Sequence, residues 1–208
     1  MTNLLVLPTQ EYKNDGYSSG QLSDVATHIE TNWNSYIKDS TGKYQMFATS
    51  DYSSPVVLNS PSDISDARRQ AVDYMDTNYQ SELHTYDAIL VRDSRNFPGA
   101  TAGLAPGGGP TPFDSRIWFA AGSIDADDCV AYSSFTLSAD LETHEVGHLY
   151  GGRHPRHEIW GVAEHTVMGN RGNETCSGGT SDYRTRRGDF HSCSVTDIRY
   201  YMDYWGLD

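Results

Sequence analysis

The first half of the chain alternates short apolar runs with longer segments whose apolar residues recur at helical spacing. Four runs of four to six residues are candidate strands: residues 3–7, 44–49, 55–58 and 86–91. Two segments are predicted as helices: one that opens at Ser23 and ends at Gly42, and one over residues 64–79. Residues 12–20 are polar and are expected to form a loop. Strands that alternate with helices in this way predict parallel strand pairing.

The second half begins with a glycine- and proline-rich loop over residues 98–112. Three further elements are predicted: a strand over residues 116–121, a helix over residues 138–151 and a last helix over residues 195–204 that is capped by Ser194. Glycine, serine, threonine and arginine dominate between the two helices, which predicts irregular structure there.

These elements predict one domain of the α/β (α+β) class over residues 1–208, because neither a repeat nor a linker divides the chain. Residues 1–150 are expected to form an upper subdomain with a mixed, mostly parallel, twisted sheet and its helices. Residues 151–208 are expected to form a smaller, irregular lower subdomain that ends in a helix, with a cleft between the two.

Residues 144–154 match the pattern H-E-x-x-H-x-x-G-x-x-H without a mismatch. Two histidines four residues apart lie on one face of a helix, so His144 and His148 can bind the same metal ion. Gly151 stands where the helix should end, because glycine adopts a positive φ without steric cost. The turn is expected to bring His154 back as a third nitrogen ligand. Three protein ligands and one open position are typical of a catalytic zinc site.

Two more residues fit such a site. Glu145 follows the first histidine and is placed to accept a proton from a metal-activated water. Met168 follows His154 by fourteen residues and precedes a glycine. The alternative is an amphipathic helix with histidines buried in an ordinary core. The eleven-residue pattern makes that the weaker interpretation.

Through these residues the chain resembles the metzincins, a clan of zinc-dependent metalloendopeptidases, over residues 137–168. The resemblance implies a zincin-type fold and one catalytic Zn²⁺ bound by the three histidines of the pattern. It implies that Glu145 is the general base in the hydrolysis of internal peptide bonds, and that Met168 forms the turn beneath the metal.

Weaker likenesses point to the adamalysin group within this clan. Residues 101–105 resemble its edge strand, and residues 190–194 resemble the segment that opens its last helix. The resemblance implies that an extended protein or peptide substrate pairs by strand addition with four residues, Ala102, Gly103, Leu104 and Ala105. Pro155 is instead a serralysin feature, and Asn170 stands where serralysins and astacins have tyrosine. The family within the clan therefore stays open.

Three cysteines allow at most one internal disulfide. Resemblance to adamalysins implies a bridge between Cys129 and Cys193, and a bridge between Cys176 and Cys193 is the local alternative. A disulfide would fit an oxidising compartment, and a secreted, extracellular location is the expectation.

The net charge of −13 argues against nucleic acid as a partner, because phosphates would be repelled. The chain has 20 Asp against 8 Glu and 3 Lys against 12 Arg. This acidic, lysine-poor composition suggests a halophilic origin, which full folding and activity in dilute buffer would contradict. No apolar run is long enough for a membrane span.

Other functions and ligands stay open. A zinc-containing binding module without catalysis, or a zinc hydrolase of a non-peptide substrate, would use the same residues. A calcium ion at the acidic residues 125–128 has no support from an EF-hand pattern. The oligomeric state does not follow from the sequence.

Overall fold

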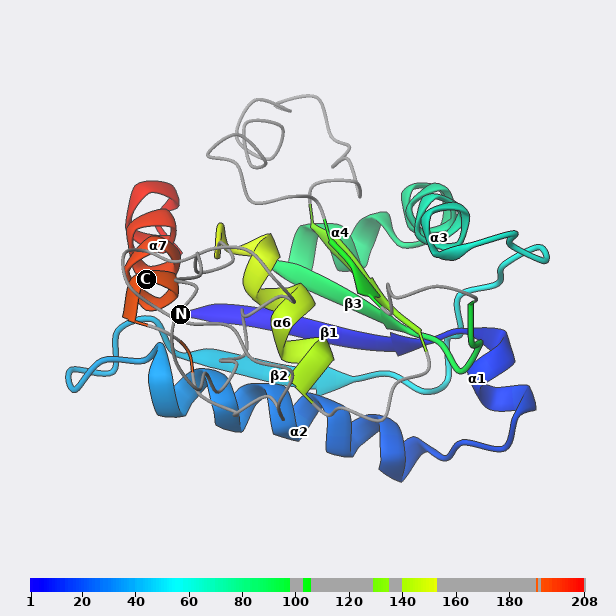
Figure 1. Ribbon diagram of the computed structural model, residues 1–208, viewed down its shortest axis with the longest axis horizontal. Coiled ribbons are helices and arrows are strands. Elements are labelled where there is room, and N and C mark those ends of the chain that lie inside the picture. Colours follow the sequence, from blue (N-terminus) through cyan, green and yellow to red (C-terminus); the bar gives the residue numbers. More distant parts are fainter. Residues whose placement is uncertain (98–102, 106–128, 135–139, 153–189, 191, 208) are drawn as a thin grey trace, which may run out of the picture.

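The computed structural model describes residues 1–97, 103–105, 129–134, 140–152, 190 and 192–207. Its centre is a five-stranded sheet in the order β2-β1-β3-β5-β4 (Figure 1). The strands are β1 (Thr2–Pro8), β2 (Met46–Ser50), β3 (Ala88–Arg92), β4 (Gly103–Leu104) and β5 (Val130–Ser133). Four strands run parallel, and β4 pairs antiparallel with β5 at the edge. The predicted α/β class and the mostly parallel sheet are confirmed.

Helices cover both faces of this sheet (Figure 1). They are α1 (Gln10–Asn14), α2 (Ser19–Tyr36), α3 (Ile64–Asn78), α4 (Gln80–Thr85), α6 (Asp140–Leu149) and α7 (Ser192–Trp205). Apolar residues of α2, α6 and α7 share one buried cluster, and those of α3 and α4 share another. Residues of β1 alternate between the two clusters, as the two-residue period of a strand requires.

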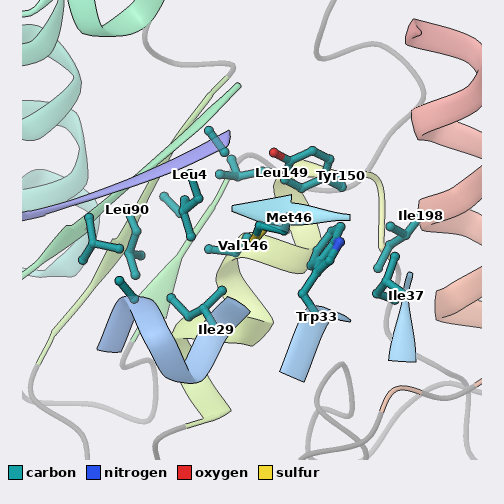
Figure 2. Close-up of a cluster of buried hydrophobic side chains, with 14 of the residues drawn as sticks. Leu4, Ile29, Trp33, Ile37, Met46, Leu90, Val146, Leu149, Tyr150 and Ile198 are labelled. Carbon is teal, nitrogen blue, oxygen red and sulfur yellow. The ribbon is translucent and has the colours of Figure 1, made fainter. Parts of the chain in front are cut away.

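The cluster that holds α6 is built around aromatic and aliphatic side chains. Figure 2 shows Ile29 and Trp33 of α2 in the same buried cluster as Val146 and Leu149 of α6. The ring of Trp33 packs edge-on against Tyr150, with centroids 4.9 Å apart. Each aliphatic side chain buried in this way stabilises the fold by about 1.5–3 kcal/mol. This packing fixes α6 against the sheet.

The N-terminal helices differ from the prediction. Part of the polar segment predicted as a loop is helical, because Thr9 caps α1 and Ser18 caps α2. The capping box closes when Ser18 Oγ accepts from Gln21 N at 3.3 Å and Gln21 Oε1 accepts from Ser18 N at 2.8 Å. This box starts α2 one turn before Ser23.

The end of α2 also differs from the predicted stop at Gly42. The helix ends at Tyr36, and Asp39 accepts hydrogen bonds from the backbone N–H of Thr41 at 2.8 Å and of Lys43 at 2.9 Å. A side chain that bonds its own backbone in this way competes with a helix. Gly42 has a φ of +87° within that turn.

Other boundaries are partly correct. The predictions for residues 3–7, 64–79 and 86–91 match β1, α3 and β3 closely. Residues 55–58 form only an isolated bridge at Val56, and both α4 and β5 were not predicted. The last helix begins at Ser192 rather than after Ser194, and Ile198, Tyr201 and Met202 are buried as expected.

Three predicted segments fall wholly or mostly outside the described residues. They are the loop over residues 98–112, the strand over residues 116–121 and residues 153–189 of the proposed lower subdomain. Within the described part of the chain, no helix is long and apolar enough to cross a membrane.

Candidate metal centre

Helix α6 buries polar side chains that normally lie at a protein surface. His144 and Glu145 are each only 5 % exposed, and Val146 and Leu149 on the same helix are fully buried in the core. Charged and imidazole groups lose hydration on burial, so they are retained where they bind partners or perform chemistry. Helix α6 therefore contributes Val146 and Leu149 to the core and also holds two buried polar side chains, His144 and Glu145.

The imidazoles of His144 and His148 converge. Their Nε2 atoms lie 3.1 Å apart, and their rings are perpendicular, with centroids separated by 4.6 Å. Nitrogen ligands of one tetrahedral zinc ion lie about 3.3 Å apart, given zinc–nitrogen bonds of about 2.0–2.1 Å. The predicted placement of both rings on one helical face is confirmed, and their spacing fits one shared metal ion.

A backbone carbonyl orients the second ring. Nδ1 of His148 lies 2.8 Å from the carbonyl oxygen of Gly152, which can only accept a hydrogen bond. Nδ1 therefore carries the proton, and Nε2 keeps the lone pair that a metal needs. The same separation of the two Nε2 atoms also allows His144 to donate a hydrogen bond to His148, and the zinc content of the protein distinguishes the two arrangements.

Glycines end α6 as the pattern predicted. Gly151 has a φ of +74°. The N–H of Gly152 donates to the carbonyl of Gly147 at 2.9 Å, and the N–H of Gly151 donates to the carbonyl of His148 at 3.0 Å. This pair of bonds is the Schellman motif, which requires a left-handed residue at the position of Gly151. The turn directs the chain away from the helix immediately before residue 153.

Replacement of Gly151 by alanine is expected to destabilise the protein by about 2–4 kcal/mol. An alanine Cβ would lie 2.9 Å from Cδ2 of Tyr201 on α7, in a backbone conformation that already disfavours a side chain. Denaturant unfolding followed by circular dichroism measures the loss.

Gly42→Ala is the matched control for this substitution. Gly42 also has a positive φ, and an added Cβ there would meet nothing within 4 Å. Equal losses in the two variants would show that the overlap of the added Cβ with Tyr201 adds nothing to the destabilisation.

The edge strand lies against Glu145. An added Cβ at Gly103 would stand 2.6 Å from both Cγ and Cδ of the Glu145 side chain. Gly103 and Leu104 form β4, in register with Ser133 and Tyr132 of β5. Gly103 and Leu104 form the last strand in the sheet order of the described residues, Ala105 directly follows it, and Ala102 lies outside the described residues. The structure thus brings the predicted base and the predicted substrate strand together.

A buried ion pair ties α6 to the sheet, and the sequence did not predict it. Nε of Arg92, at the end of β3, lies 3.1 Å from Oε1 of Glu142. Burial raises the pKa of the Glu142 carboxyl, and the positive charge of Arg92 opposes that rise. The Arg92 guanidinium also donates to the carbonyl oxygens of Asp93 and Ser134. These contacts join α6 to the ends of β3 and β5.

The first turn of α6 is held from its other side by α2. The carboxylate of Asp140 lies 3.1 Å from Nε2 of His28 and accepts from the amide of Asn32 at 3.3 Å. An acidic side chain in the first turn also interacts favourably with the helix dipole. Contacts with two separate elements therefore fix the direction of α6.

The remaining predicted site residues are only partly described. His154 and Met168 lie outside the described residues, as do the acidic residues 125–128. Cys129 is buried within the second cluster, and the side chain of Cys193 is not among those described, so their disulfide stays a prediction. Among the residues that are described, no three His, Cys, Asp or Glu side chains group as metal ligands, and the predicted third ligand is not among them.

Comparisons with known proteins support the fold. No family model and no curated protein matches the chain. Similar solved structures include one described as "Structure of a chaperone-substrate complex", with a TM-score of 0.59 and 16 % sequence identity. The alignment covers 99 % of this chain and 34 % of that chain, so this chain spans about a third of its length. At this identity the likeness supports the mixed α/β fold alone.

Proposed function

We propose that this protein is a zinc-dependent endopeptidase of the metzincin type. The observation that carries the proposal is the convergence of two Nε2 atoms, 3.1 Å apart, within an unbroken H-E-x-x-H-x-x-G-x-x-H pattern. The carbonyl of Gly152 favours the tautomer of His148 that can bind a metal. The left-handed Gly151 is a second feature that the pattern requires.

Three histidines would hold the ion: His144 and His148 from α6, and His154 three residues after the turn. When bound, zinc would supply a Lewis acid that polarises water and the scissile carbonyl. Three imidazoles and one open position are the donor set of a catalytic zinc site, as opposed to a closed structural one.

Glu145 would move the proton. Its carboxylate would accept a proton from the attacking water and then deliver it to the nitrogen of the leaving amine. It follows the first ligand in the sequence, and it lies buried against β4. Water is largely excluded around such a group, which strengthens its electrostatic interactions with a reacting substrate.

Strand β4 would bind the substrate. It is the last strand in the described sheet order, and an extended peptide can pair with such an edge through backbone hydrogen bonds. The short distance between Gly103 and Glu145 would bring a peptide bound there beside the proposed base.

Removal of the metal tests this proposal. The purified protein is expected to contain about one zinc per chain and to digest casein. A zinc chelator should stop digestion, and added zinc should restore it. The measurement is release of acid-soluble peptides, with the zinc content determined by elemental analysis.

Other outcomes identify the alternatives. Digestion that continues in the zinc-free protein would refute the proposal. A protein that binds zinc and leaves casein and a peptide library intact would instead be a zinc-containing binding module or a hydrolase of a non-peptide substrate.

A further inference from the structure

Gly103 leaves no room for a side chain of its own, because an added Cβ would overlap the side chain of Glu145. An alanine Cβ there would stand 2.6 Å from Cγ and Cδ of Glu145, closer than carbon atoms approach in folded proteins. Gly103 is not among the residues with positive φ, so its backbone conformation suits any amino acid. Glycine is therefore needed at this position because the Glu145 side chain occupies the space of a Cβ, and not because of the backbone conformation.

We infer that the absence of a side chain at Gly103 sets the position of the Glu145 carboxylate, which makes Gly103 a positioning residue for the proposed base. This inference rests on the proposed peptidase function. It assigns β4 a role besides substrate pairing, because the strand also forms one wall of the space that the carboxylate occupies.

The two partners differ in how easily they can move. Strand β4 is paired with β5, where Gly103 stands opposite Ser133. The side chain of Glu145 is long and can change rotamer, whereas its Cα is fixed within a packed helix. An added methyl group should therefore displace the carboxylate and leave the strand in place. We expect the fold to tolerate this change, whereas catalysis is sensitive to a displacement of about 1 Å.

Gly103→Ala tests the inference. We expect kcat on a fluorogenic peptide to fall about 10²-fold, KM to change less than threefold, and zinc content and melting temperature to stay close to those of the parent protein. A crystal structure of the variant should show the Glu145 carboxylate displaced by about 1 Å or more. A raised KM with unchanged kcat, or a carboxylate in its original place, would overturn the inference.

A double variant shows whether Gly103→Ala lowers kcat by displacing Glu145 or by a general change in strand β4. In a Glu145→Gln background, Gly103→Ala should cause no further loss of residual kcat, because both changes act on the same group. A further loss of about 10²-fold would refute the positioning role. Gly20→Ala on α2 is the matched control, since an added Cβ there would meet only Ser18 Oγ at 3.7 Å, and it should retain kcat within threefold.

Failure of the inference differs from failure of the proposed function. If the unmodified protein cleaves no peptide, the proposed function fails. If it cleaves peptides and Gly103→Ala cleaves them equally fast, the proposed function stands and the inference fails.

Discussion

Replacement of Glu145 by glutamine is expected to lower kcat/KM by about 10²–10⁴-fold, the usual contribution of a general base. Glutamine preserves the size and shape of the side chain, but its amide cannot accept a proton from water. The three histidines of the pattern are unchanged, so the variant should still bind about one zinc per chain. Peptide cleavage and elemental analysis on the same preparation measure the two properties.

Glu30→Gln is the matched control for this prediction. Glu30 lies on α2, where its carboxylate accepts from the backbone N–H of Ala48 at 2.9 Å. That variant should cleave at the parental rate. Undiminished cleavage by the Glu145 variant would show that the base is another group, and a loss of zinc from it would show that the carboxylate contributes to metal binding.

The elements that could be predicted from the sequence are those fixed by local interactions. The length and apolar content of β1 and β3 suffice to identify buried strands. Gly151 marks the end of α6 because the turn there needs a residue with a positive φ. The i, i+4 spacing likewise places His144 and His148 on one face without any knowledge of the rest of the fold.

Elements defined by distant partners were harder to predict. Strand β5 has only four residues, and it is a strand because β3 and β4 flank it in the sheet. Residues 55–58 have a comparable apolar content but acquire only one bridge, because Val56 pairs with Thr9, just beyond the end of β1 at Pro8. Propensity alone does not separate these two cases.

The same limit applies to the surroundings of the site. Gly103 and Glu145 are 42 residues apart in the chain, and Arg92 and Glu142 are 50 residues apart. A single sequence gives no signal that the members of either pair are in contact. A signal did exist for Glu142, because it shares the helical face of Val146, four residues later. A charged residue on an apolar face indicates a buried partner, although not which one.

Replacement of His148 by alanine is expected to abolish both zinc binding and cleavage. The change removes one of three proposed ligands, and it also removes the hydrogen bond between Nδ1 and the carbonyl of Gly152. Zinc that binds the folded state raises stability by about 4 kcal/mol when its free concentration is a thousand times Kd. Added zinc should therefore raise the melting temperature of the parent protein and leave that of the variant unchanged.

This zinc-dependent shift separates a metal ligand from a structural histidine. If His144 and His148 only formed a hydrogen-bonded pair, the variant would lose stability and zinc would affect neither protein. His84→Ala on the exposed side of α4 is the control, and it should keep both the zinc content and the thermal shift. Together with Glu145→Gln, which should keep the metal and lose cleavage, the His148 variant assigns binding and proton transfer to different side chains of the same helix. A His148 variant that retained one zinc per chain would remove the basis for the proposed centre.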